Sequence, residues 1–300
     1  MELAKRFKVL QLMAFTACLM CLCCGWAAAG QASYVGSETC LDCHDEMETA
    51  FNASLHGKAW ASMDAYQDSG CEACHGPGSA HADDPSIETI KTFGKNSLQS
   101  AKEQSDSCLG CHSASQEIAL WDMGKHAKRD VSCSSCHKIH AGYSPKPDSP
   151  KVCYGCHLDV KIDANKASRH PIKEDQTGCN DCHNPHGTLS KAQIRDESTN
   201  QLCYQCHPDK RGPFLYEHPP VEENCMNCHT PHGSRHKKLL TQKVPNLCQN
   251  CHEVHSVRDK TRMFEGAFPS RFGYGRSCLN CHQTIHGSWS PNSRGANLFH

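Results

Sequence analysis

The chain has little of what usually builds a protein core. After residue 29, no apolar run approaches the ~20 residues that a membrane-spanning helix needs. Leu, Ile, Val and Phe make up only 37 of the 271 residues from 30 to 300. Burial of so few apolar side chains cannot by itself offset the conformational entropy that the chain loses on folding. No alternating strand pattern of useful length occurs. The formal net charge of −1 gives no reason to expect a nucleic-acid partner.

Residues 1–29 are predicted to be a cleaved signal peptide. Three basic residues come first, residues 9–26 are apolar, and the alanines at 27–29 form an A-x-A cleavage site. The alternatives are an uncleaved membrane anchor, or a lipid-modified cysteine among residues 18–24. We expect an exported protein that works in the periplasm.

Every one of the 20 cysteines beyond residue 29 belongs to a C-x-x-C-H unit. In such a unit two thiols add to the vinyl groups of one porphyrin, and the adjacent histidine binds the iron from one face. A single unit could instead be a zinc knuckle or a thioredoxin-like redox pair. Ten units behind an export signal, with no cysteine left over, predict ten covalently bound haems c.

The predicted haem-attaching cysteines are Cys40, Cys43, Cys71, Cys74, Cys108, Cys111, Cys133, Cys136, Cys153, Cys156, Cys179, Cys182, Cys203, Cys206, Cys225, Cys228, Cys248, Cys251, Cys278 and Cys281. The predicted proximal iron ligands are His44, His75, His112, His137, His157, His183, His207, His229, His252 and His282.

Ten further histidines match the ten irons, so we predict two histidine ligands for every haem. The predicted distal ligands are His56, His126, His170, His218 and His255, and, close behind the second motif of each pair, His81, His140, His186, His232 and His286. Met263 is the alternative to His255, and as a ligand it would raise the potential of that haem. Among the remaining histidines, His236 lies in a basic run that is either solvated or faces a haem propionate.

The motifs and spare histidines form five repeats of a two-haem unit, at about 40–81, 108–140, 153–186, 203–232 and 248–286. We expect two pentahaem halves, residues 30–165 and 166–300. Helical signals are short, at 46–60 and 116–129, and turn-rich connectors lie between repeats. The predicted fold is an elongated multihaem cytochrome c of loops and short helices around closely packed haems, with little or no sheet. Haem faces would supply the missing core, so the chain without haem should be unfolded.

The segment CNDCHNPHG, residues 179–187, carries one motif and the spare His186. Two axial ligands approach an iron from opposite faces, so His186 cannot easily serve the haem bound beside His183. We expect His186 to bind the haem of Cys153 and Cys156. His170 would then bind the haem of the segment's own motif.

Saturated irons pass electrons but bind substrate poorly, whereas a catalytic metal keeps an open position. No lysine-terminated C-x-x-C-K motif of the nitrite reductase type occurs in the sequence. We therefore predict an electron carrier and not an enzyme.

Several segments resemble the periplasmic decahaem cytochromes of porin–cytochrome conduits, the Mtr/Dms type. They are CEACHGPGSAH (71–81) with TFGK (92–95), CNDCHNPHG (179–187), KRGPFLYEHPPVEENCMNCHTPHGS (210–234) and GRSCLNCHQTIHGS (275–288). The resemblance covers essentially all of the chain after residue 29. Only residues 30–39 precede the first motif, so any partner-docking arm there would be short.

The resemblance implies a haem wire inside an outer-membrane β-barrel porin, because exposed polar backbone cannot itself cross lipid. Its implied partners are periplasmic electron-donor cytochromes and, outside, a multihaem surface cytochrome or an extracellular metal oxide, in metal reduction or iron oxidation. Two alternatives stay open. One is a free periplasmic electron shuttle or store, and the other is a multihaem reductase.

Overall fold

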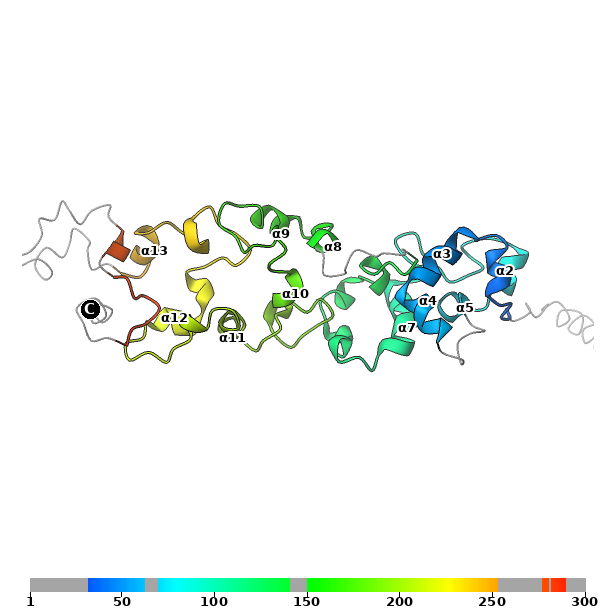
Figure 1. Cartoon of the computed structure of the whole chain (residues 1–300), viewed down its shortest axis with the longest axis horizontal. Helices are drawn as coiled ribbons and strands as arrows, with labels where there is room; N and C mark the ends of the chain where they lie inside the picture. The colour runs from blue at the N-terminus through cyan, green and yellow to red at the C-terminus, as the bar shows by residue number, and fades with distance from the viewer. Residues whose placement is uncertain (1–31, 63–69, 141–149, 253–276, 281, 290–300) are drawn as a thin grey trace, which may run out of the picture. The chain divides into compact units, whose positions relative to one another are not determined.

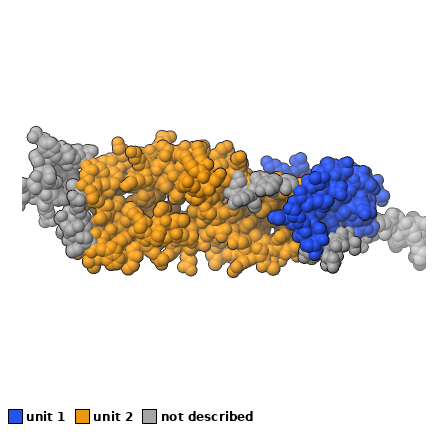
Figure 2. Space-filling model, viewed as in Figure 1, with its two compact units in different colours: residues 1–98 blue, residues 99–300 orange. Residues whose placement is uncertain are grey.

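The computed structural model describes residues 32–62, 70–140, 150–252, 277–280 and 282–289. The chain forms two compact units, residues 1–98 and residues 99–300 (Figure 2). The first unit contains the first predicted repeat, and the second unit contains the other four. This boundary differs from residue 165, where the sequence analysis divides the chain, and the grouping into two pentahaem halves remains a prediction.

The first unit consists of short helices joined by irregular segments (Figure 1). The helices are α2 (Ser37–Leu41), α3 (Glu46–Ala53), α4 (Leu55–Ala61), α5 (Glu72–His75) and α6 (Ser79–Asp83). The helix predicted over 46–60 is two helices, because Ser54 is extended and its Oγ accepts a hydrogen bond from the Gly57 N–H at 3.0 Å. Serine is a favoured N-cap, so it ends one helix and starts the next.

The second unit is built in the same way. Its α-helices are α7 (Ala101–His112), α8 (Pro150–Tyr154), α9 (Leu158–Asp163), α10 (Cys179–Cys182), α11 (Thr199–Tyr204), α12 (Pro219–Glu223) and α13 (Asn246–Gln249). Its 3-10 helices are η2 (Gln116–Ile118), η3 (Trp121–Met123), η4 (Ala127–Arg129), η5 (Cys133–Ser135), η6 (Lys191–Gln193), η7 (Pro208–Lys210), η8 (Cys225–Asn227), η9 (Lys237–Leu239) and η11 (Cys278–Asn280). The helical signal at 116–129 is thus a run of 3-10 turns.

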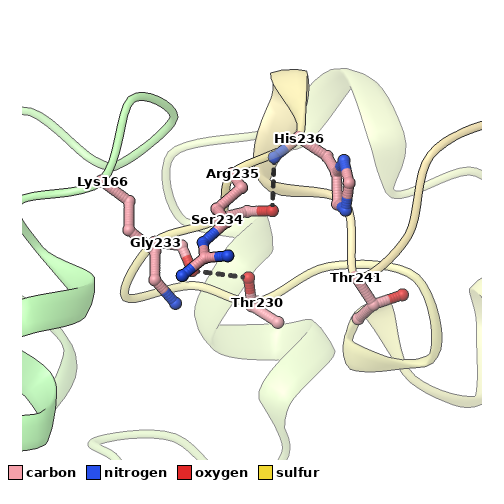
Figure 3. A pocket seen from close by; sticks show the side chains of 7 residues that line it. All are labelled: Lys166, Thr230, Gly233, Ser234, Arg235, His236 and Thr241. Atoms are coloured by element: carbon pink, nitrogen blue, oxygen red, sulfur yellow. Dashed lines mark hydrogen bonds between the residues drawn. The ribbon is translucent and has the colours of Figure 1, made fainter.

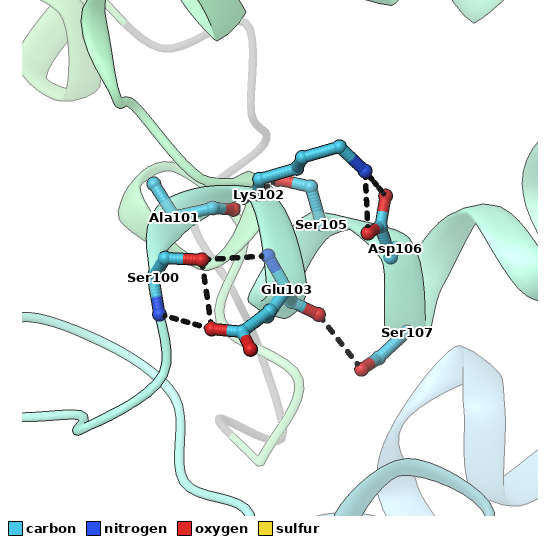
Figure 4. A network of polar contacts seen from close by, with 7 residues as sticks. All are labelled: Ser100, Ala101, Lys102, Glu103, Ser105, Asp106 and Ser107. Carbon is cyan, nitrogen blue, oxygen red and sulfur yellow. Dashed lines mark hydrogen bonds and ion pairs between the residues drawn. The ribbon is translucent and has the colours of Figure 1, made fainter.

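Helix α7 shows how a helix positions a motif. At its start Ser100 and Glu103 form a capping box, in which each side chain binds the other residue's backbone N–H (Figure 4). An ion pair between Lys102 and Asp106 at 2.7 Å follows on the exposed face. The helix then ends at His112, so its last turn is the third C-x-x-C-H unit.

Strand pairing in the described residues is limited to isolated bridges. They join Ser168 to Ser234, His183 to Ile194, Tyr216 to Ser288 and His229 to Leu240. Within this part of the chain, no helix has the length and apolar character needed to cross a membrane. The predicted fold class, short helices and loops without a sheet, is confirmed.

The described residues bury very little hydrophobic surface. Trp121 and Ala164 are the buried hydrophobic residues among them. Large hydrophobic side chains are instead exposed, namely Tyr34, Leu55, Ile87, Leu98, Met123, Leu158, Ile162, Leu189, Leu215, Met226 and Trp289. The described residues therefore form no apolar core of their own, as the prediction of a haem-built core requires.

Candidate haem-binding sites

Each described C-x-x-C-H unit folds as one helical turn. In nine of the units the histidine N–H donates to the first cysteine's carbonyl over 2.8–3.1 Å, and the Cys108 unit is the last turn of α7. Residues three apart share one face of a helical turn, so both thiols point the same way. No disulfide joins the described cysteines of these units. Cys281 lies outside the described residues.

The first cysteines of the two motifs in each repeat are in contact. In each repeat the two thiols lie close enough for one to shift the pKa of the other, and the pairs are Cys40 with Cys71, Cys108 with Cys133, Cys153 with Cys179, Cys203 with Cys225 and Cys248 with Cys278. The paired thiol lowers the pKa of Cys133 to about 6 and that of Cys179 and Cys225 to about 7. The structure thus brings together the two haem attachment points of every repeat.

Second cysteines connect one repeat to the next. Burial is the main cause that raises the pKa of the Cys136 thiol. The thiols of Cys153 and Cys156 are close enough for their charges to raise this pKa further. The same holds for Cys182 with Cys206 and for Cys228 with Cys251. Contacts between first cysteines therefore alternate with approaches of second cysteines along the second unit.

Seven proximal histidines face a predicted distal histidine. The ring-centroid distances are 6.3 Å for His44–His81, 6.1 Å for His126–His157, 6.0 Å for His137–His186, 6.4 Å for His170–His207, 6.0 Å for His183–His232, 6.1 Å for His218–His252 and 6.2 Å for His229–His286. Two metal–imidazole bonds of about 2 Å, plus the distance from each nitrogen to its ring centre, add to roughly 6 Å. One iron fits between each pair of rings.

Backbone carbonyls orient several of these rings. Nδ1 contacts a carbonyl oxygen at 2.8 Å in His126 (Pro185), 2.7 Å in His170 (Pro231), 2.9 Å in His183 (Ala192) and 2.8 Å in His229 (Lys238). Because a carbonyl can only accept, Nδ1 carries the proton and Nε2 keeps its lone pair for a metal. Among the described residues no cluster of three or more His, Cys, Asp or Glu side chains could hold a bare ion. Paired histidines suit an iron whose other four ligands come from a porphyrin.

Burial keeps several of the facing rings neutral. It lowers the pKa of His137, His186, His218 and His232, and in each case the facing or a neighbouring histidine lowers it further. Burial also lowers the pKa of His286. Neutral imidazole is the form that binds a metal.

The structure contradicts the pairing expected for CNDCHNPHG. His186 faces His137 of the preceding repeat, while the ring at the Cys153 motif, His157, faces His126. The reason is a close backbone approach. Gly187 has φ +124°, and a Cβ there would lie 2.3 Å from the carbonyl oxygen of Leu120. This contact, open only to glycine, takes His186 into the second repeat.

The expected partner of His170 is also wrong. His170 faces His207 of the following repeat, and the ring of the Cys179 motif, His183, faces His232. The bond from His170 to the Pro231 carbonyl places this side chain beside the fourth repeat. Spare histidines therefore cross between repeats in both directions.

A returning loop supports the proximal histidine in the third and fourth repeats. Ala192 and Lys238, each nine residues after its histidine, supply the carbonyls that accept from His183 and His229. Both residues have positive φ, 58° and 60°, which is uncommon for residues other than glycine.

A hollow of about 180 Å³ lies beside the fourth repeat (Figure 3). Lys166, Arg235 and His236 are among its lining residues, and Lys166 also pairs with Asp163. The basic run around His236 thus faces a hollow that could take a carboxylate, which agrees with the propionate-facing alternative.

Other ligand assignments stay predictions. His255 and Met263 lie outside the described residues, so the choice between them stays open. The assignments of His56, His75, His112, His140 and His282 remain predictions.

Sequence analysis missed a set of buried polar residues. Glu72 is 2% exposed, Gln104 5%, and Asn200 7%, and each hydrogen-bonds to segments far along the chain. Glu72 lies between the two cysteines of CEACH, and Asn200 lies three residues before a motif. Gln104 lies four residues before a motif, so the three residues share no common offset and no spacing signal identifies them as a set.

Comparisons with known proteins agree with this geometry. The model of the doubled CXXCH motif matches residues 170–212 and 218–256, and that of the NrfB-like cytochrome c-type protein matches residues 71–147. The doubled-motif matches join motifs across the repeat boundaries used here, where second cysteines approach one another.

The chain is also 39% identical over 277 residues to the multiheme cytochrome MtrA of Shewanella baltica (strain OS185). The alignment covers 89% of this chain and 83% of that protein. Such identity over nearly the full length, together with haem-attachment turns and facing histidines, shows that the chain belongs to the MtrA-like family of multihaem c-type cytochromes, which are electron carriers.

Proposed function

We propose that this protein carries ten haems, each bound by two histidines, and conducts electrons through the outer membrane inside a β-barrel partner. The bound haems supply one-electron redox chemistry. The polypeptide supplies the thioether attachment points, the axial nitrogens and the fixed spacing.

The observation that carries the proposal is the continuous series of close approaches between cysteines of successive motifs in the second unit. It runs from Cys108–Cys133 through Cys136–Cys153 and Cys153–Cys179 to Cys182–Cys206, and on through Cys203–Cys225 and Cys228–Cys251 to Cys248–Cys278. Each haem in this series has its attachment point beside that of the next haem. An enzyme needs one active centre, whereas a conductor needs such a series without a break.

Histidine on both faces of an iron favours electron transfer over catalysis. In seven pairs, the second ring stands where a substrate would have to bind. A multihaem reductase would show a high-spin, five-coordinate haem. A purely low-spin spectrum of the purified protein is expected instead.

We infer the barrel from the family resemblance and from a physical argument. The polypeptide of a haem conductor cannot cross lipid bare, because polar backbone groups would be left unsatisfied. We propose periplasmic donor cytochromes at one end and a surface multihaem cytochrome or a metal oxide at the other. The proposed location is the periplasm, in association with the outer membrane.

Extraction of cells separates this proposal from a free periplasmic shuttle. We expect the cytochrome to remain with the outer-membrane fraction when the periplasm is released without detergent, and to co-purify with a β-barrel after detergent extraction. Release of the whole cytochrome pool without detergent and without a barrel would contradict the conduit and favour the shuttle.

A further inference from the structure

Three side chains occupy the same place relative to a haem motif. Ser37, Ser105 and Asn200 each lie three residues before the first cysteine of a repeat, Cys40, Cys108 and Cys203. We call them the minus-three side chains. Residues three apart lie on one face of a helix, so each minus-three side chain faces the same neighbour as the cysteine that follows it.

That neighbour is the second motif of the same repeat. Ser37 Oγ accepts a hydrogen bond from the Cys71 N–H at 3.1 Å, and Ser105 Oγ accepts one from the Cys133 N–H at 3.4 Å. Asn200 Oδ1 accepts from the Cys225 N–H at 2.7 Å. In all three repeats the donor is the backbone N–H of the first cysteine of the second motif.

The donor group explains why these bonds form. Each second motif is a short helical turn, and the first N–H groups of a helical turn have no partner within it. The minus-three side chain caps this turn from a different helix. It therefore binds the cysteine whose thiol touches the first cysteine of the repeat.

Two of the three minus-three side chains are buried. Ser105 is 2% exposed and Asn200 is 7% exposed. Asn200 also donates through Nδ2 to the carbonyls of Val221 and Glu222, both at 2.9 Å, which ties α11 to α12. Buried side chains with fixed partners hold their geometry better than exposed ones.

The third and fifth repeats differ at this position. Pro150 and Pro245 lie three residues before Cys153 and Cys248, and proline carries no side-chain acceptor. Two of the five pairs therefore lack this bond.

We propose that Ser37, Ser105 and Asn200 are positioning residues, which fix the two haems of their repeat relative to each other through the cysteine N–H of the second motif. The third and fifth repeats hold their pairs without this contact. The proposal requires haems on both motifs of a repeat and does not depend on a barrel partner.

The test uses the haem-loaded full chain. Circular dichroism in the Soret region reports coupling between neighbouring porphyrins, and hydrogen exchange reports protection of the Cys225 amide. In Asn200→Ala we expect loss of one component of the Soret couplet and about tenfold faster exchange at Cys225, the effect of losing one buried hydrogen bond.

Asn200→Ser is the rescue variant, because serine serves this purpose in the first two repeats. It keeps an acceptor for Cys225 but loses the bonds to α12, so its couplet should stay close to that of the unaltered protein. Gln201→Ala, an exposed change on the same helix, should have no effect. Ser105→Ala provides a second, independent site should Asn200→Ala fail to take up all its haems, which mass spectrometry checks.

The proposal is overturned if Asn200→Ala and Ser105→Ala keep the full couplet. It is also overturned if Asn200→Ser loses as much of the Soret couplet as Asn200→Ala does. The hydrogen bonds from Asn200 to α12, and not the bond to Cys225, would then explain the loss. Loss of the couplet in Gln201→Ala would equally contradict a specific role for the minus-three side chains.

Discussion

Single carbonyl oxygens decide which nitrogen of a histidine is free in this protein. The carbonyls of Pro185, Pro231, Ala192 and Lys238 each hold an Nδ1 proton, and so they direct Nε2 towards a facing ring. Partners of this kind orient a ligand and tune the metal it binds. The residues around the rings therefore matter as much as the ligands themselves.

Glu72 is a fixed buried charge inside the second motif. Its carboxylate accepts from the N–H groups of Gly36 at 2.8 Å and Gly78 at 2.7 Å, and from that of Val35. A nearby negative charge stabilises ferric over ferrous iron. We expect Glu72→Gln to raise the potential of one haem by about 60 mV, a tenfold change for one electron, as measured by spectroelectrochemistry. The exposed Glu88→Gln is the control, and equal shifts in both variants would contradict a local effect.

Gly187 is the residue whose size decides the place of His186. In Gly187→Ala a methyl group would meet the Leu120 carbonyl at 2.3 Å and the backbone would be strained at φ +124°. We expect His186 to leave its position, so that one haem becomes high-spin in the electron paramagnetic resonance spectrum, at a cost in stability of about 1–3 kcal/mol. Gly178→Ala, where φ is −104° and the nearest atom, Asp181 Oδ2, would lie 3.8 Å away, should stay low-spin. A fully low-spin spectrum of Gly187→Ala would contradict the claim that Gly187 fixes an axial ligand through His186.

Among the structural elements, the C-x-x-C-H turn could be predicted from the sequence and the pairing of histidines could not. The turn is local, because its spacing alone places two thiols and one ring together. The pairing depends on contacts between repeats, such as Gly187 with Leu120, that no spacing reveals. The helix expected over 46–60 was likewise interrupted by a local serine cap, a competing signal within the same stretch.

Exchange of histidines between repeats is open to a direct test. We expect His170→Met to raise the potential of the haem attached through Cys203 and Cys206, because His170 faces His207 and a methionine ligand favours ferrous iron. Nuclear magnetic resonance of the haem methyl groups, assigned through the attaching cysteines, identifies the haem that shifts. A shift in the potential of the haem attached through Cys179 and Cys182 would contradict this exchange. It would support the pairing expected from the sequence, in which His170 binds that haem.

For the molecule as a whole, the haems must replace the core that the side chains do not form. Only Trp121 and Ala164 are buried hydrophobic residues in the described part of the chain. The protein made without haem attachment should therefore lack cooperative thermal unfolding and protected amides, while the haem-loaded protein shows both. Cooperative unfolding of the haem-free chain, followed by circular dichroism, would contradict this account.

The proposed conduit role requires that electrons cross a membrane through this chain. The most direct measurement uses vesicles that enclose a reduced dye, with an iron(III) oxide outside and the cytochrome inserted together with its barrel. The account predicts rapid oxidation of the dye when both proteins are present, and no oxidation with the barrel alone or the cytochrome alone. No oxidation with both proteins present, or equal oxidation with the barrel alone, would contradict it.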